Sequence, residues 1–229
     1  MAQKIQLTVT QKELIADQIY LVTFHLVNPP AISFRAGQNM MLMVAPGVNR
    51  TMSIASPPSS ANDLVMVHDV SPMGPGSKWT VGLNVGDSAT IVAPIGGALS
   101  FLSTPKKKVM VATGTGVAPF HAMIPDAGEK YQMALYWGLR YPKDIYWRED
   151  FDAMANHQQN FSWHMVLSKP DEAWNGLTGH VTEHVLETEK EKEKSEFYLC
   201  GNKAMIEEVR TELLQENVPK EQIKTELFF

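Results

Sequence analysis

Apolar and polar positions alternate in short runs along the first hundred residues. Residues 5–14 (IQLTVTQKEL) alternate strictly enough for a half-buried strand, and residues 19–27 (IYLVTFHLV) are rich in β-branched and aromatic side chains. Similar runs follow at 34–44, 64–70 and 87–94, separated by turn sequences such as NPP, PGVN and NVGD. Short strands with frequent turns are typical of an antiparallel barrel or sandwich. The pattern therefore predicts an antiparallel β domain.

The pattern changes near residues 100–108 (SFLSTPKKK), where we place the hinge between two domains, 1–103 and 104–229. Beyond it, strand-like sequences at 106–116, 131–140, 161–168 and 195–202 alternate with helical spacing at 145–157, 180–194 and 204–217. Strand–helix alternation predicts βαβ units and a parallel sheet. The low-complexity stretch 187–196 (ETEKEKEKSE) alternates in sign and is interpreted as a solvated face.

Composition narrows the class of protein. The 229 residues are 44% hydrophobic and 20% charged, which is ordinary for a globular chain with a core. A net charge of −5 argues against general nucleic-acid binding. No apolar run approaches the roughly 18 residues of a membrane span, and the N-terminus lacks a signal-peptide pattern. The single cysteine, Cys200, excludes an internal disulfide and favours a reducing compartment, so we expect a cytoplasmic protein.

A glycine-rich turn between a strand and a helix is the first candidate binding site. In VMVATGTGVAPF (109–120), Gly114 and Gly116 permit a tight turn and close approach of a ligand, and Pro119 suits a first helical turn. The exposed N–H groups at such a helix start bind phosphate or pyrophosphate. A turn that merely connects two elements is the alternative.

Two further stretches carry anion-binding chemistry. Arg50 in RTMSIAS can bind phosphate with two parallel hydrogen bonds, although a surface ion pair is its ordinary role. Ser53 shares a strand face with Arg50 only where a bulge or twist intervenes, unless a ligand lies along the strand edge. In GPGSKW (74–79), Ser77 is predicted to cap a short helix running through Trp79 and Leu83, whose start would offer N–H groups to an anion. A plain turn with a capping serine is the alternative.

The C-terminal part holds two more candidates. Cys200 follows a predicted parallel strand, at the end where open α/β sheets bind ligands, or it is a small core residue. Glu226 precedes two terminal phenylalanines, which either fill a hydrophobic groove or stack on a flat ligand.

Taken in order, RTMSIAS, GPGSKW, GTGVAPF, YLCGNKAM and the C-terminal Glu–apolar–aromatic end resemble the ferredoxin–NADP reductase superfamily. The resemblance extends from FRAGQ (34–38) to the last residues. It implies an antiparallel β-barrel that binds FAD, followed by a Rossmann-like α/β domain with a parallel sheet that binds NAD(P)H. It also implies the activity of a flavoprotein reductase that takes hydride from NAD(P)H.

The resemblance also implies roles for individual residues. The flavin would be held by Arg50 at its diphosphate, by Met52, by Ser53 near N5, by the backbone of Val67 and His68, by Gly76 and Ser77, and by a stacked Phe228. The pyridine nucleotide would be held by Gly114, Thr115 and Gly116, with Ser168 and Lys169 near the adenosine ribose. Ser53, Cys200 and Glu226 would form the catalytic set around the nicotinamide and the flavin.

Three residues depart from the superfamily's pattern. Met52 stands where an aromatic side chain usually packs on the flavin, which suggests weaker flavin binding. Gly97 stands where photosynthetic members carry a phosphate-binding lysine, so the choice between NADH and NADPH is open, and Phe229 extends beyond the usual terminal aromatic. Ser168 and Lys169 could bind a ribose 2′-phosphate or belong to a solvated loop.

We expect the electron acceptor to be a separate protein or small molecule, because the single cysteine of this sequence cannot hold an iron–sulfur cluster. The favoured interpretation is an FAD-bound reductase that serves a ferredoxin, a flavodoxin or an oxygenase component. One alternative is a flavin reductase that uses free flavin as a substrate, and another is a regulatory protein that only binds nucleotide. Retention of FAD through purification separates the first two.

Overall fold

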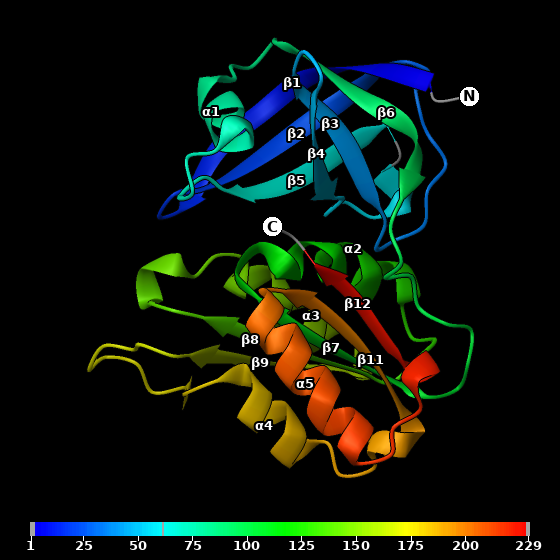
Figure 1. Ribbon diagram of the computed structural model, residues 1–229, viewed down its shortest axis with the longest axis vertical. Coiled ribbons are helices and arrows are strands. Elements are labelled where there is room, and N and C mark those ends of the chain that lie inside the picture. The colour runs from blue at the N-terminus through cyan, green and yellow to red at the C-terminus, as the bar shows by residue number, and fades with distance from the viewer. Residues whose placement is uncertain (1–2, 61, 228–229) are drawn as a thin grey trace. The chain divides into compact units, whose positions relative to one another are not determined.

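The computed structural model describes residues 3–60 and 62–227, which form two compact units (Figure 1). The first unit contains residues up to 100 together with 118–126, and the second contains 101–117 and the residues from 127 onward. None of the helices in the described part of the chain is both long enough and apolar enough to cross a membrane.

The first unit is built on an antiparallel six-stranded sheet with the order β4-β3-β6-β1-β2-β5. Its strands are β1 (Gln3–Ala16), β2 (Ile19–Asn28), β3 (Asn39–Ala45), β4 (Val48–Ser53), β5 (Asp63–Asp69) and β6 (Ser88–Gly96). Because the residues alternate between two faces, one face collects the apolar side chains. This confirms the predicted antiparallel barrel, and it leaves β4 and β5 as the two edge strands.

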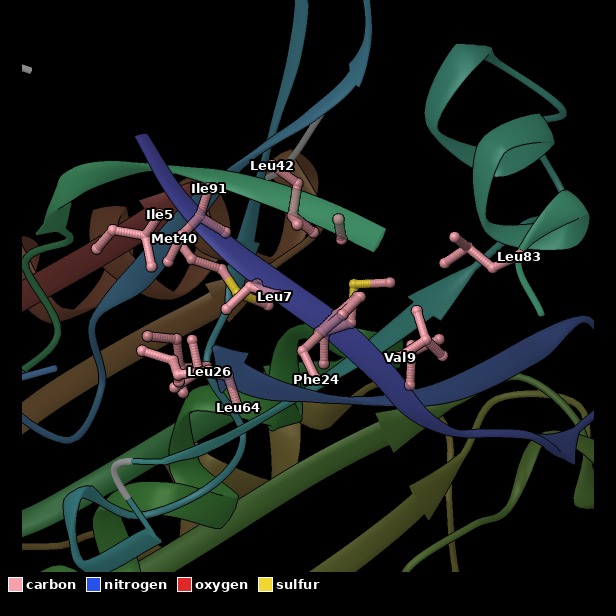
Figure 2. Close-up of a cluster of buried hydrophobic side chains, with 14 of the residues drawn as sticks. Ile5, Leu7, Val9, Phe24, Leu26, Met40, Leu42, Leu64, Leu83 and Ile91 are labelled. Atoms are coloured by element: carbon pink, nitrogen blue, oxygen red, sulfur yellow. The ribbon is translucent and has the colours of Figure 1, made fainter. Parts of the chain in front are cut away.

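The barrel core is formed by buried side chains of every strand except the edge strand β4, together with Leu83 at the end of a helix and with Phe34 and Ile54 in connecting segments (Figure 2). Leu7, Phe24, Met40 and Ile91 are fully buried in it. Leu83 follows α1 (Pro75–Gly82) and joins the same core, so the short helix is fixed against the barrel by its C-terminal end. Burial of such side chains stabilises the fold by roughly 1.5–3 kcal/mol each.

The second unit is a parallel six-stranded sheet with the order β10-β9-β8-β7-β11-β12. Its strands are β7 (Lys107–Thr113), β8 (Met133–Leu139), β9 (Phe161–Leu167), β10 (Leu177–Thr178), β11 (Ser195–Gly201) and β12 (Ile223–Leu227). The chain builds outward from β7 to β10 and then returns to place β11 on the other side of β7. The strand order therefore reverses between β7 and β11, which confirms the Rossmann-like arrangement.

Helices accompany this parallel sheet. They are α3 (Arg148–His157), α4 (Val181–Thr188) and α5 (Lys203–Gln215), while α2 (Ala118–Ala127) belongs almost entirely to the first unit. Helices α4 and α5 share a buried cluster with Tyr136 of β8. Phe151 of α3 packs against Trp137, the next residue of the same strand, with ring centroids 5.8 Å apart. Consecutive strand residues point to opposite faces, so the sheet is covered on both sides.

The acidic and basic stretch 187–196 is not simply a solvated face. The helix predicted over 180–194 ends at Thr188, and the next residue, Glu189, is buried and binds Lys107 at 2.7 Å. Lys192 is also buried and binds Glu216 at 2.9 Å. The alternating signs thus supply partners for ion pairs with distant segments, which the local pattern did not reveal.

A buried ion pair anchors the segment that enters the parallel sheet. Lys108 Nζ lies 2.6 Å from Glu196 Oε2, with side chains only 0% and 2% exposed. Lys108 also donates to the carbonyl of Thr104 and lies 4.3 Å from the ring centroid of Tyr131. Burial raises the pKa of the Glu196 carboxyl, but hydrogen bonds from Lys108, Thr104 and Tyr198 outweigh it and lower the pKa below 4.5.

Replacing Lys108 by Met should destabilise the protein by roughly 3–5 kcal/mol, because Glu196 would keep a buried charge without its cation. Because the folded-state pKa of Glu196 is lowered, the contribution of the pair is present at neutral pH and lost as the pH falls through that lowered value. Urea unfolding at pH 7 measures the change. Lys194→Met is the matched control, since the Lys194–Glu191 pair is exposed. Equal effects of both variants would mean that the buried pair contributes no more than a surface pair.

Candidate functional site

Five of the residues expected to hold a flavin lie on the two edge strands of the barrel. Arg50, Met52 and Ser53 belong to β4, and Val67 and His68 belong to β5. An edge strand has N–H and C=O groups without a neighbouring strand, so it can bind a ligand along its length. The sequence predicted these residues but not their position at open edges.

Arg50 and Ser53 leave β4 on opposite faces. Arg50 pairs with Leu42 and Ser53 pairs with Asn39, and the register is continuous between them. The bulge that would place both side chains on one face is therefore absent from this described stretch. Without a bulge, a joint role of Arg50 and Ser53 requires a twist of the strand or a ligand that follows the strand edge. Met52 shares the face of Arg50 and packs against the barrel core.

The two serines of RTMSIAS have different surroundings. Ser56 donates to the carbonyl of Asp63 at 2.9 Å and accepts from the N–H of Val65 at 3.2 Å, so it ties the chain after β4 to β5. Ser53 Oγ is buried and has no hydrogen-bond partner among the described residues. A buried hydroxyl without a partner costs about 1–3 kcal/mol. The polar edge of a flavin ring would supply this partner, so the residue fits that cofactor.

The first backbone N–H groups of α1 have no side-chain cap. Its N-cap is Gly74, Pro75 occupies the first turn, and no side chain caps this end. The prediction that Ser77 caps the helix is wrong, because the helix begins earlier and Ser77 is buried inside its first turn. The first N–H groups of a helix have no intrahelical acceptor, so those of Gly76 and Ser77 can bind a diphosphate.

The side chains of Arg50 and His68 lie next to Gly76 at the start of this helix. A Cβ atom at Gly76 would lie 3.1 Å from Arg50 Cγ and 3.4 Å from His68 Cε1. Three of the residues expected at the flavin site therefore converge from β4, β5 and α1. His68 also bonds Thr80 through its side chain, with 2.8 Å between Nδ1 and Oγ1, a contact that the sequence did not suggest.

The glycine-rich turn lies where the strand order of the parallel sheet reverses. Gly114 begins a 3₁₀ turn (Gly114–Val117) after β7, has φ +54°, and faces open space where a Cβ would stand. Gly116 has the opposite surroundings, since its Cβ would lie 2.3 Å from the carbonyl oxygen of Cys200. Gly114 is thus the one open to a ligand, whereas Gly116 permits contact with the backbone at the end of β11. Thr115 lies between them and is half-buried.

Neighbouring residues that the sequence did not indicate hold this turn in place. Trp137 Nε1 and the hydroxyl of Tyr146 donate to the carbonyl of Gly114 at 3.0 and 3.3 Å. Thr113 Oγ1 accepts from the backbone and side-chain nitrogens of Asn202, which also caps α5. Asn202 could have been found from the sequence, because an Asn directly after the strand sequence YLCG is a typical helix cap. The aromatic donors Trp137 and Tyr146 could not, because they come from segments distant in sequence.

Cys200 and Glu226 lie side by side, paired in register on β11 and β12. The thiol is fully buried, and burial followed by the charge of Glu226 raises its pKa well above 9. Cys200 is therefore a neutral packing residue, in keeping with the expectation that it need not be a nucleophile. Phe228, predicted to stack on the flavin, and Phe229 lie outside the described residues.

Ser168 and Lys169 are exposed and follow β9, two strands from β7 and its glycine turn. Their N–H groups donate to the carbonyls of Leu139 and Arg140 at 3.0 and 2.8 Å. These bonds place the backbones of Lys169 and Arg140 next to each other at the carboxyl ends of two parallel strands. Arg140 was not predicted, although it directly follows a strand in the sequence.

Gly97 has a backbone reason to be glycine. Its φ is +106°, and a Cβ would lie 3.0 Å from the N–H nitrogen of Asn39. A lysine at this position would be strained in this conformation.

Comparison with known proteins agrees with this architecture. Residues 110–211 match the family of oxidoreductase NAD-binding domains. The chain is 28% identical over 233 residues to the anthranilate 1,2-dioxygenase electron transfer component of Acinetobacter baylyi, covering 98% of this chain and 67% of that protein. It is 32% identical over 162 residues to a component of the Na(+)-translocating NADH-quinone reductase of Actinobacillus pleuropneumoniae, covering 66% of this chain but only 38% of that component.

Solved structures show the same fold. The Amycolatopsis cytochrome P450 reductase GcoB superposes with a TM-score of 0.91 at 24% identity, covering 99% of this chain and 70% of GcoB. A ferredoxin NADP⁺ reductase from Neisseria gonorrhoeae with bound FAD and NADP gives 0.77 at 23% identity, covering 100% and 99%. The fold is that of the two-domain ferredoxin reductases. Together with the match to a NAD-binding domain, this fold agrees with the two-domain architecture predicted from the sequence.

Alanine at the two glycines of the turn should have unequal effects. Gly116→Ala should cost about 3 kcal/mol or more, because its methyl group would overlap the Cys200 carbonyl and backbone must move. Gly114→Ala should cost only roughly 1–2 kcal/mol, since the left-handed conformation is strained but the space is empty. Urea unfolding of both variants measures the difference. If Gly114→Ala lowered the free energy of unfolding at least as much as Gly116→Ala, the conclusion that Gly114 faces open space while Gly116 is tightly packed would be refuted.

Cys200 should not react with a thiol reagent in the folded protein up to pH 9, because the raised pKa keeps the buried thiol neutral. Iodoacetamide labelling followed by mass spectrometry, with and without urea, measures this. Modification should occur only in urea. Rapid stoichiometric labelling of the folded protein at pH 8 would mean that the thiol is exposed and ionised.

Proposed function

We propose that this protein is a flavoprotein reductase that oxidises NAD(P)H and passes the electrons to a separate acceptor. The observation that carries the proposal is the buried hydroxyl of Ser53, which has no partner among the described residues and lies on an open edge strand. The convergence of Arg50, Gly76 and His68 at the uncapped start of α1 supports it. The NAD-binding domain match over residues 110–211 supports the other half of the reaction.

The proposed division of roles follows the domains expected from the sequence, with FAD bound by residues 1–103 and the pyridine nucleotide by residues 104–229. Arg50 and the N–H groups of Gly76 and Ser77 bind the flavin diphosphate, while the backbone of Val67 and His68 lines the site. Gly114, Thr115 and Gly116 hold the pyrophosphate of the nucleotide. In this proposal the protein acts in the cytoplasm.

When bound, FAD would supply the redox chemistry of hydride acceptance and onward electron transfer. The protein orients the reactants and excludes water. Ser53 offers its hydroxyl to the flavin N5 edge, and Glu226 holds or moves a proton beside the nicotinamide. Cys200 stays a neutral thiol that shapes the pocket, as its burial requires.

The identity of the nucleotide depends on the far end of its site. Ser168 and Lys169 are proposed to contact the adenosine ribose, and the backbone of Arg140 lies beside that of Lys169. Two cationic residues at neighbouring strand ends favour a ligand with an additional phosphate, so the arrangement is compatible with NADPH as well as NADH.

The acceptor is proposed to be a ferredoxin, a flavodoxin or an oxygenase component. Reductases named as partners of a dioxygenase and of a cytochrome P450 are among the similar proteins, which supports an oxygenase partner. The alternative is a reductase for which free flavin is the substrate. It is favoured by Met52, which packs against the barrel core and offers a flavin less rigid stacking than an aromatic ring.

Replacing Arg50 by Ala should weaken FAD binding at least about tenfold, because a charge-assisted contact to the diphosphate is lost. The flavin absorbance of the purified protein and the dissociation constant for FAD measure this. Ser53→Ala is the matched variant, which should keep FAD but be reduced more slowly by NAD(P)H. Unchanged FAD affinity in Arg50→Ala would contradict the diphosphate assignment.

A further inference from the structure

His68 fastens helix α1 to the barrel. The side chains of residues 64, 66 and 68 of β5 share one face of the strand, the inner one, where Leu64 and Met66 are fully buried. His68 lies at the end of this row, where its Nδ1 is 2.8 Å from the hydroxyl of Thr80, a residue with no exposed surface. This is a polar contact between α1 and the edge strand.

Other contacts hold the remaining parts of the same helix. Trp79 stacks on Phe24 with ring centroids 6.3 Å apart, and Leu83 enters the barrel core. Lys12 Nζ donates to the carbonyl of Leu83 at 2.8 Å, which satisfies the C-terminal end. The N-terminal end has no side-chain cap. Among these contacts of α1, the hydrogen bond between Thr80 and His68 is the one that connects two polar side chains and joins the helix to β5. His68 also borders Gly76.

The imidazole also stands beside the cation that is proposed to bind the diphosphate. His68 Cε1 and Arg50 Cγ lie 3.4 and 3.1 Å from the Cβ position of Gly76, so both side chains border the same glycine. Burial lowers the pKa of His68, Asp69 raises it, and Arg50 lowers it, so that it lies below 6.5. Tyr20 pairs with His68 from β2, and Lys78, the charged residue of α1, is exposed.

We propose that His68 is a proton-linked positioning residue of the flavin diphosphate site. Through Thr80 it holds the start of α1 at the distance from Arg50 that a diphosphate requires, and it takes up a proton when the diphosphate binds. This proposal rests on the proposed function. An anion beside His68 favours the imidazolium, so the complex binds more protons than the free protein. FAD affinity therefore increases as the pH falls from 8 towards 6, by up to about tenfold per pH unit.

The experiment is a titration of the full-length protein, freed of flavin, with FAD at pH 6, 7 and 8, followed by flavin fluorescence. The wild type should bind FAD more tightly as the pH falls. His68→Gln should lose this dependence, because the amide does not titrate. Thr80→Val should bind FAD roughly three- to tenfold more weakly at each pH while keeping the dependence, because one hydrogen bond is lost but His68 remains.

His25→Gln is the matched control. His25 lies on β2 of the same sheet, is exposed, and pairs with Asp63 at 2.8 Å, so the pH dependence should be that of the wild type. A His68→Gln variant that keeps the wild-type dependence would overturn the proton linkage. A Thr80→Val variant with unchanged affinity would overturn the positioning role. Failure of the wild type to bind FAD at any pH would instead refute the proposed function.

A measurement on the unsubstituted protein covers the case in which the variants do not fold. The pKa of His68 is read from the NMR shifts of its imidazole, first in the free protein and then with FAD bound. The pKa should be below 6.5 in the free protein and rise on binding. An unchanged pKa would overturn the proton uptake, whatever the variants do.

Discussion

The backbone contact between Gly116 and Cys200 constrains the whole end of the parallel sheet. The carbonyl oxygen of Cys200 stands 2.3 Å from where a Cβ of residue 116 would be, so only glycine permits this approach. Because β7 and β11 are adjacent, the turn after β7 and the end of β11 are held together. This leaves Gly114 facing open space at the point where doubly wound sheets bind nucleotides.

The barrel carries its candidate binding groups on its edge strands. Its two edge strands carry Arg50, Ser53 and His68, while helix α1 brings an uncapped end to the same region. A buried hydroxyl and a helix end without caps are each unfavourable in an isolated protein. Both become favourable when a ligand with a diphosphate and a polar ring edge is bound. The features that cost stability in this unit are therefore the ones that a flavin would satisfy.

The fold class was predictable because the two halves have different hydrophobic patterns. Alternating apolar positions in the first half favour an antiparallel sheet with one buried face, and strand–helix alternation in the second half favours a parallel sheet covered by helices. The sequence also identified Gly114, Gly116 and Arg50 as candidate binding residues from their local sequence context, and their binding roles stay predictions. It could not predict that Ser77 lies inside a helix rather than at its cap, because Gly74 and Pro75 provide an equally good start. The bond between His68 and Thr80, like the burial of Glu189, depends on distant segments meeting in space.

The most direct test of the proposed flavoprotein reductase activity is the visible absorbance spectrum of the purified protein. The spectrum is followed without oxygen as NADPH and then NADH are added. We expect a flavin band that is bleached by at least one of the two nucleotides, and the faster one identifies the preferred donor. A colourless protein that oxidises NAD(P)H only with added flavin would make flavin a substrate. A colourless protein that neither binds FAD nor oxidises either nucleotide would contradict the proposed function.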